Sequence, residues 1–578
     1  MDNQRNMVLA IVLSALVLIG WTALADRFFP QPKPSATTAA PAPAAPAGGP
    51  APAASAKAKP SLRDVKAVLA EGNRVIIETP RLSGSINLKG AEIDDLVLLT
   101  YRETVKKNSP PVRLLSPGGA KNSYYAGFGW LGEGAAVPGP DTLWTSSGAK
   151  LTPQTPVTLS WDNGAGQVYR IGIAIDANYM FTIEQSVINN GTGAVAARSY
   201  SYVSRTRGAH TGGSMLAPSK DVDSWTMHIG PIGTFNAKAN YDVDYDDVDE
   251  AGAAGMRFPT RGGWLGFGET YWLTALVPAS GMNVDAGFRS GNGSYQAEFS
   301  TPQALVGPGK TLTSTSHLFA GAKEVRTLDT YEENLGIPLF GKAIDWGWFE
   351  IIEKPIFYYL DWLFKLVGNF GIAIILLTLT VRGLMFPIAQ RQFASMAAMR
   401  VVQPKLKALQ ERYKDDKPKL QQEMMALYQA EKINPMAGCL PIFLQIPVFY
   451  ALYKVLMLTI EMRHQPFALW IHDLSAPDPA TIINLFGLLD FTPPSFLALG
   501  IFPVLLGITM WLQFKLNPAP MDPVQQQMFS IMPWIMMFMM APFAAGLQLY
   551  WIASNVLTIA QQKWLYSRHP ALKEPVKA

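Results

Sequence analysis

Cysteine is almost missing from this chain. Its 578 residues include a single one, Cys439, which lies in an apolar run. One cysteine excludes an intrachain disulfide and any metal site built from several thiolates. A part of the chain that faces an oxidising compartment would therefore fold without a covalent staple.

Charged residues are also scarce. They make up 16% of the chain, and 48 Lys and Arg against 44 Asp and Glu leave a net charge of +4. So small an excess gives no reason to expect nucleic acid specificity. The mean hydropathy is +0.11, and the chain carries 23 Met and 15 Trp. These values indicate a mixture of soluble and membrane-embedded parts.

The amino-terminal segment begins with an apolar run from Met7 to Ala25, preceded by Arg5. The run is long for a signal peptide, so we expect residues 1–29 to be an uncleaved transmembrane anchor. Cleavage near Ala23 or Ala25 is the alternative. Residues 30–60 are Pro/Ala-rich with little apolar bulk, which predicts a disordered linker.

Residues 61–335 show a period of two, typical of strands. Clear examples are 73–79, 167–175 and 179–187, separated by turn residues at 162–166 and 190–191. Many short strands at this spacing predict one large, all-β antiparallel sandwich.

Two features of this β region could be mistaken for catalytic motifs. Gly307-Pro-Gly-Lys-Thr311 resembles the end of a phosphate-binding loop, but Ala304 stands where the first glycine is needed and a strand-like segment follows. We therefore expect a hairpin turn. His210 and His228 could serve a sugar-processing enzyme, but nothing in the sequence ties an acid to them.

Residues 336–360 mix aromatic and charged side chains just before a long apolar run. This pattern predicts an amphipathic helix in the membrane interface. The aromatic belt of the following helix is the alternative.

The apolar run from Gly368 to Pro387 carries one cation, Arg382. A hydrocarbon core about 30 Å thick takes roughly 20 helical residues, so the run is long enough to span a membrane. Arg382 would then lie inside it, about five residues from one face. An arginine so placed needs water or an anionic partner.

Residues 388–434 are polar and predict a helical hairpin. Apolar residues recur every three or four positions up to a break at Asp415-Asp-Lys-Pro418, and a second helix follows from Leu420 to Glu431. We expect Pro404 to kink the first helix. The excess of Lys and Arg places the hairpin in the cytoplasm.

Four further apolar runs follow, at about 437–458, 496–516, 528–541 and 546–562, and a tail covers 563–578. Alternating sides from the cytoplasmic hairpin puts both termini in the cytoplasm and the β region outside. With the anchor, the sequence predicts six spans, five of them in a core at 361–562.

No carboxylate in these core spans lies near Arg382. The candidates to face it are neutral polar residues of this span and of the later ones: Thr378, Gln445, Gln513, Gln548, Ser554 and Asn555. Facing Arg382, they would line a wet groove that opens to the cytoplasm. A snorkelling arginine on a lipid-facing helix is the alternative.

Several motifs resemble the YidC family of membrane protein insertases, in order over roughly residues 340–566. They are Thr378-Leu-Thr-Val-Arg-Gly-Leu-Met-Phe-Pro387, Ser395-Met-Ala-Ala-Met-Arg400, Gln403-Pro-Lys405, Gln422-Glu-Met-Met-Ala-Leu-Tyr428, Asn434-Pro-Met-Ala-Gly-Cys-Leu-Pro441, Pro466-Phe-Ala-Leu-Trp-Ile-His-Asp-Leu-Ser475 and Leu549-Tyr-Trp-Ile-Ala-Ser-Asn555. The remainder resembles Gram-negative members of this family.

The resemblance implies a multidomain membrane protein of the bacterial inner membrane, with a periplasmic β-supersandwich and residues 26–360 in the periplasm. It implies an insertase and chaperone, not an enzyme, that places nascent membrane proteins in the phospholipid bilayer, alone or with the Sec translocon and its accessory subunits. The resemblance also suggests the ribosome as a partner, and it implies no cofactor or metal.

The resemblance also assigns site residues. It places Arg382 in a groove closed towards the periplasm, and it places Ile446, Pro447, Pro542 and Tyr550 along the path of the inserting helix. Trp551 belongs to the groove, although a second tyrosine would be usual there.

A second departure from the family pattern is Lys454, inside a span at a commonly neutral position. Lys454 lies close enough to the outer end of the span to snorkel.

Two alternatives belong to other functional classes. A solute transporter or channel with a periplasmic sensor would need ionisable pairs or repeated halves, and the sequence shows neither. A periplasmic sugar enzyme on an anchor would need an active β domain.

Overall fold

The computed structural model describes residues 63–206, 227–413, 416–431, 440–481, 483–484, 489, 499–516 and 523–568. The contacts group residues 54–578 into one unit. The amino-terminal anchor, the Pro/Ala-rich linker, His210 and the carboxyl-terminal tail beyond 568 lie outside the described residues.

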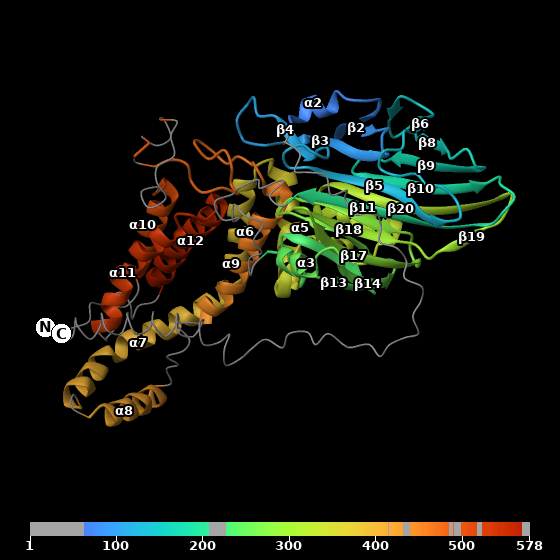
Figure 1. Ribbon diagram of the computed structural model, residues 1–578. Coiled ribbons are helices and arrows are strands. Elements are labelled where there is room, and N and C mark those ends of the chain that lie inside the picture. The colour runs from blue at the N-terminus through green and yellow to red at the C-terminus, as the bar shows by residue number, and fades with distance from the viewer. Residues whose placement is uncertain are drawn as a thin grey trace. The chain divides into compact units, whose positions relative to one another are not determined.

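The described strands form two sheets (Figure 1). The first sheet has eleven strands in the order β14-β17-β18-β11-β5-β3-β2-β1-β7, with β19 on β11 and β4 on β3. The second has nine, in the order β13-β12-β15-β16-β20-β10-β9-β8-β6. Described strand pairs are antiparallel except β1 with β7.

The strands of the first sheet are β1 (Arg74–Glu78), β2 (Leu82–Asn87), β3 (Glu92–Arg102), β4 (Pro111–Leu115), β5 (Tyr124–Glu133), β7 (Lys150–Leu151), β11 (Val195–Thr206), β14 (Met256–Arg261), β17 (Asn283–Gly291), β18 (Ser294–Ser300) and β19 (Ala304–Val306). Those of the second are β6 (Thr145–Ser146), β8 (Val157–Asp162), β9 (Gln167–Ile175), β10 (Met180–Asn189), β12 (Gly230–Phe235), β13 (Lys238–Asn240), β15 (Trp264–Gly268), β16 (Trp272–Pro278) and β20 (Lys310–Ala322).

Alternation of buried and exposed side chains explains why these segments are strands. Along β9, every second residue from Gln167 to Ile175 is buried, which matches a strand with one face on a core. The buried faces meet in an aromatic-rich core that includes Trp130, Tyr169 and Phe267. The predicted sandwich is confirmed in these residues, and we call it the β domain.

The glycine-rich segment and His228 have structural roles in the β domain. The backbone N–H of Lys310 donates to the carbonyl oxygen of Gly307 at 3.1 Å, and β20 follows directly, so the glycine-rich segment is a tight turn. The predicted hairpin is wrong, because the turn joins β19, which pairs with β11 in the first sheet, to β20 in the second sheet. His228 is buried, and its Nε2 lies 2.7 Å from the carbonyl oxygen of Pro231.

Helices follow the strands in the second half of the chain. The β domain carries the short helices α2 (Val65–Leu69) and α3 (Tyr245–Ala251) and ends in α4 (Val325–Leu335). Then come the 3₁₀ turns η1 (Phe340–Ala343) and η2 (Gly347–Phe349), and the helices α5 (Glu350–Val367), α6 (Phe370–Leu384), α7 (Phe386–Arg412), α8 (Lys417–Ala430), α9 (Leu440–Leu458), α10 (Ile501–Leu516), α11 (Pro523–Met540) and α12 (Ala545–Arg568), with the 3₁₀ turn η4 (Ile460–Met462) after α9.

The helix predicted over residues 336–360 differs from its prediction in where it begins and ends. Gly347 adopts a left-handed φ of 65° inside the preceding turn, so the regular helix α5 begins only at Glu350. It continues to Val367, where Gly368 caps it in the left-handed conformation. We call the segment between α4 and α5, residues 336–349, the connector.

The apolar run that carries Arg382 forms α6. Asn369 caps its amino terminus by accepting a hydrogen bond from the N–H of Ile372. The helix ends at Leu384, three residues before the predicted end at Pro387, which instead lies in the first turn of α7. The two helices of the predicted hairpin, α7 and α8, are present, and Pro404 lies inside α7.

Length and composition alone single out few membrane-spanning candidates among the described residues. No single described helix is both long enough and apolar enough to cross a membrane. Two consecutive helical segments, Phe370–Leu384 and 386–392, reach that length and apolar character together, with a bend of 56° at the break between them. Gln445–Leu458, Ile501–Leu516 and Gln527–Met540 are shorter apolar helices.

Helix α12 contacts α6, α9 and α10, and α11 contacts α10. Helix α5 contacts α6 and α9. Gly371 lets α6 approach Phe467 in the loop after η4 closely, since a Cβ there would lie 2.0 Å from Cδ2 of Phe467. Only a glycine lets α6 meet this ring without displacing it.

Candidate functional site

Arg382 lies in the last turn of α6 and reaches α12. Its Nε donates to Oγ of Ser554 at 3.0 Å, and its Nη2 donates to the same oxygen. The arginine is half-buried, while Ser554 is buried. Among described residues, no carboxylate forms an ion pair with it. A neutral hydroxyl therefore holds a cation whose charge is not cancelled by an acid.

A second polar contact joins α9 to α12. Nε2 of Gln445 donates to the hydroxyl oxygen of Tyr550, and Oε1 of Gln445 is buried without a hydrogen-bond partner in the described part of the chain. One residue along α12, the ring of Trp551 meets Phe449 edge-on at 4.9 Å between centroids. These pairs bring the predicted groove residues of α9 and α12 together.

Two other predicted groove residues form hydrogen bonds with partners other than Arg382. Asn555 donates from Nδ2 to Oγ1 of Thr509 on α10 at 3.2 Å. Thr378 is fully buried, and its hydroxyl donates to the carbonyl oxygen of Ile374 one turn earlier at 2.7 Å. Thr509 was missed from the sequence, although it stands one helical turn before Gln513 in the same apolar run.

The residues assigned to the path of the inserting helix differ in exposure. Ile446, one residue after Gln445 on α9, is 57% exposed. Pro447 is half-buried and Pro542, in the turn between α11 and α12, is exposed, whereas Tyr550 is buried. Gln548 donates to the carbonyl oxygens of Met540 and Phe543, so it braces this turn rather than facing Arg382.

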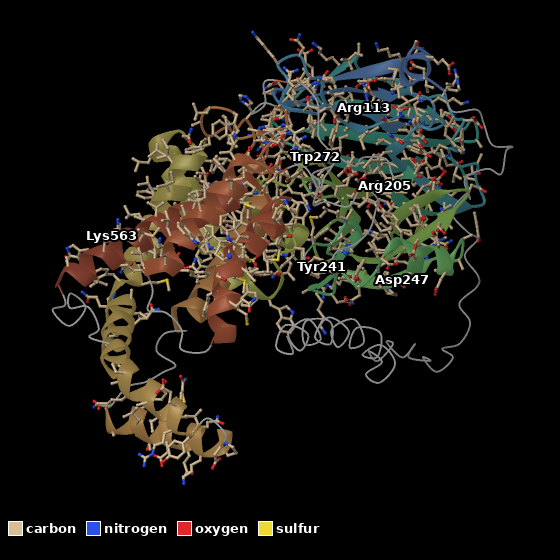
Figure 2. The ribbon with its side chains drawn as sticks, turned by 90° about the vertical axis from the view of Figure 1, so that its left-hand side faces the viewer. Arg113, Arg205, Tyr241, Asp247, Trp272 and Lys563 are labelled. Atoms are coloured by element: carbon tan, nitrogen blue, oxygen red, sulfur yellow. The ribbon has the colours of Figure 1, made fainter. Side chains whose placement is uncertain are left out.

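The β domain is bonded to the connector. Three side chains of the domain donate hydrogen bonds to backbone carbonyl oxygens of the connector. Nε1 of Trp264 donates to the carbonyl oxygen of Pro338 at 3.2 Å. The hydroxyl of Tyr241 donates to the carbonyl oxygen of Lys342 at 2.7 Å, and Nζ of Lys323 donates to the carbonyl oxygen of Ala343 at 3.2 Å. Tyr241 and Trp272 mark this side of the domain (Figure 2), and Arg463 from the loop after α9 lies over the ring of Trp272.

Buried charges concentrate at this junction. Oε1 of Glu461, in η4, accepts a hydrogen bond from the backbone N–H of Val325 at the start of α4. Burial raises the pKa of Glu461 to about 7, although the N–H bonds oppose the shift. Burial opposes ionisation of Glu324 as well, but hydrogen bonds from Tyr101, Arg81 and Thr327 hold its pKa below its ordinary value.

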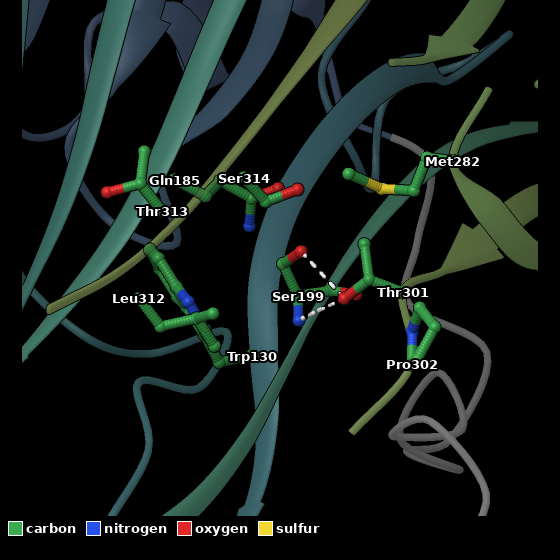
Figure 3. A pocket seen from close by; sticks show the side chains of 9 residues that line it. All are labelled: Trp130, Gln185, Ser199, Met282, Thr301, Pro302, Leu312, Thr313 and Ser314. Atoms are coloured by element: carbon green, nitrogen blue, oxygen red, sulfur yellow. Dashed lines mark hydrogen bonds between the residues drawn. The ribbon is translucent and has the colours of Figure 1, made fainter. Parts of the chain in front are cut away.

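A cavity of about 180 Å³ lies within the β domain (Figure 3). It is lined by Trp130, Gln185, Ser199, Met282, Thr301, Pro302, Leu312, Thr313 and Ser314. The hydroxyls of Ser199 and Thr301 bond to one another at 3.1 Å. None of the lining residues is acidic or a histidine, so the cavity offers no acid and base pair for sugar chemistry.

Comparison with known proteins covers both halves of the chain. A family model described as YidC periplasmic domain matches residues 74–359, and one described as 60Kd inner membrane protein matches residues 362–572. A membrane protein insertase YidC from Zymomonas mobilis subsp. mobilis is 50% identical, with 99% of this chain and 96% of the relative covered. Another from Methylobacterium nodulans is 45% identical, with 98% and 96% covered. A solved structure of an active YidC insertase is 19% identical, with a TM-score of 0.37 and with 85% of this chain and 92% of that chain covered.

Proposed function

This chain belongs to the YidC family of membrane protein insertases, and we propose that it receives the polar tail of a nascent membrane protein at Arg382. The family relationship establishes a membrane protein insertase of the inner membrane with a periplasmic domain that is mostly β-sheet. The proposal concerns the site and the route.

The contact between Arg382 and Ser554 carries this proposal. Two of the five guanidinium N–H groups donate to one hydroxyl oxygen, and no described carboxylate pairs with the cation. The remaining donors are available to water and to an incoming acidic group. At 4 Å and an effective dielectric constant near 20, attraction to one carboxylate is about 4 kcal/mol before desolvation.

The route follows from the cost of moving polar groups through lipid. Unpaired amides and charges lose their water there, so a hydrated groove that reaches partway into the bilayer shortens the dry path. We place this groove between α6, α9 and α12, where Arg382, Gln445, Ser554, Asn555 and Trp551 lie. The apolar helix of the substrate then slides out past Ile446, Pro447, Pro542 and Tyr550, and its transfer into lipid supplies the free energy.

The proposal includes a topology and partners. We place spans at the amino-terminal anchor, α6, α9, α10, α11 and α12, with both termini and the α7–α8 hairpin in the cytoplasm and residues 26–360 in the periplasm. The substrates are nascent membrane proteins, with the Sec translocon and the ribosome as further partners. The chain needs no cofactor and catalyses no covalent step in this scheme.

The test uses cells depleted of their own insertase and supplied with Arg382→Ala or Arg382→Lys. We expect lysine, but not alanine, to restore insertion of a single-span protein with an acidic tail, because lysine keeps the charge. Lys515→Ala, which removes an exposed cation on α10, is the matched control. Full activity of Arg382→Ala on the acidic-tailed substrate would remove Arg382 from the mechanism.

The transporter alternative is not favoured, because the relatives that match over almost the whole chain are named insertases. Flux of small solutes through liposomes that contain the purified protein, set against insertion of a single-span protein, separates the two functions.

A further inference from the structure

Lys454 is a lysine within α9 that the proposed route does not use. The sequence leaves room for it to snorkel to water, but the structure buries it, with 2% of its surface exposed. Its Nζ donates to the backbone carbonyl oxygen of Asp345 in the connector at 2.7 Å. The ammonium group thus ends inside the protein, under the connector.

The connector is shaped around this ammonium group. Gly347 takes the left-handed conformation, and a Cβ there would lie 3.7 Å from Nζ of Lys454. The carboxylate of Asp345 accepts a hydrogen bond from the N–H of Gly347 at 3.1 Å, which fixes the turn and turns the Asp345 carbonyl to the lysine side. The backbone turn at residues 345–347 therefore lies against the ammonium group of Lys454.

A carboxylate faces the same place from α5. Glu353 is fully buried, and neither of its side-chain oxygens has a hydrogen-bond partner in the described part of the chain. Burial raises the pKa of Glu353 to about 7, and the positive charge of Lys454 opposes this shift. A lone buried acid beside a buried lysine is tolerated only while the two stay together.

A ring contact strengthens the attachment of α9. Phe349, the last residue of the connector, meets Tyr450 edge-on at 5.4 Å between centroids. Tyr450 lies one helical turn before Lys454, so both residues hold the same end of α9 against the connector. The connector's other side is bonded to the β domain through the carbonyls of Pro338, Lys342 and Ala343.

We propose that Lys454 is a positioning residue through which the connector and the β domain hold α9 in place. This inference rests on the proposed function, since α9 carries Gln445 and Ile446 of the proposed route. Lys454 does not touch the substrate. It sets where the exposed side chain of Ile446 stands relative to α12.

The experiment places a photocrosslinker at Ile446 or Trp551 and presents a stalled nascent chain, with and without Lys454→Met. A charge-assisted hydrogen bond is strong enough for about a tenfold shift in the docked population. We therefore expect a crosslink at Ile446 that is weaker by up to about tenfold, while capture at Trp551, three residues before Ser554 on α12, persists. Lys365→Met, at an exposed lysine of α5, should change neither crosslink.

A second variant separates positioning from stability. Lys454→Met with Glu353→Met removes both buried charges, and we expect it to regain any protein level that Lys454→Met loses. The Ile446 crosslink should stay weak, because the bond to the Asp345 carbonyl is still missing.

Wild-type crosslinking at Ile446 in either variant would overturn the inference and leave the role of Arg382 intact. Loss of the Trp551 crosslink in Arg382→Lys, with Lys454 present, would instead count against the proposed function.

Discussion

Glu353 and Glu461 make the stability of the junction depend on pH. Burial raises the pKa of each to about 7, against an ordinary value of 4.5. The folded junction thus binds more protons than the opened one between these two values. Stability is therefore greatest below about pH 4.5, falls as the pH rises to about 7, and is constant above.

The size of the effect follows from the shift. One pKa unit corresponds to about 1.36 kcal/mol, so Glu353 alone can lower the stability of the closed junction by about 3 kcal/mol across this range. That is about 300-fold in the population of the opened state. Glu461 adds a similar contribution in the same range.

The assay is amide hydrogen exchange of peptides from α5, measured from pH 5 to pH 8 and corrected for the intrinsic exchange rate. We expect the free energy of opening to fall with pH in the wild type. The side chain in Glu353→Gln is neutral at every pH, so this variant should remove the contribution of Glu353 to the pH dependence of the free energy of opening. Glu461→Gln should remove the contribution of Glu461 in the same way. An unchanged slope in Glu353→Gln, or protection that grows with pH, would refute the reasoning.

Two further predictions concern the packing of helices outside the junction. Gly371→Ala puts a Cβ 2.0 Å from the ring of Phe467. We expect the free energy of unfolding, measured by thermal unfolding, to fall by about 1 to 3 kcal/mol, and adding Phe467→Leu to restore part of it. No recovery in the double variant would contradict the steric cause. Asp478 accepts hydrogen bonds from the N–H groups of Ala480 and Phe502 and from Nε1 of Trp470. We expect Asp478→Ala to cost about 2 kcal/mol and to raise hydrogen exchange in the first turn of α10; unchanged exchange there would show that the cap is dispensable.

Local patterns in the sequence were enough to predict a β region followed by a helical region, with several individual strands. The strand at 167–175 has the predicted bounds because alternation and its flanking turns are local properties. Helix bounds were less accurate. The helix expected from residue 336 begins at Glu350, since the connector's turns depend on bonds to the β domain that no local pattern records.

The candidate site divides in the same way. Polar residues in apolar runs pointed to Gln445, Ser554 and Asn555 as candidates to face Arg382, and the structure places Ser554 on Arg382. The partner of each residue could not be predicted. Asn555 bonds to Thr509 rather than to Arg382, because the choice depends on how α10 and α12 pack.

Arg382 and Lys454 show why a lone cation in an apolar helix does not reveal its role from sequence. Both would be costly in lipid without a partner. Lys454 is held by a backbone carbonyl beside a buried carboxylate, so its charge is already committed within the protein. Arg382 rests on a neutral hydroxyl, which satisfies two donors without cancelling the charge. The difference lies in the partner, and it is why we propose that Arg382 attracts an acidic substrate while Lys454 holds a helix.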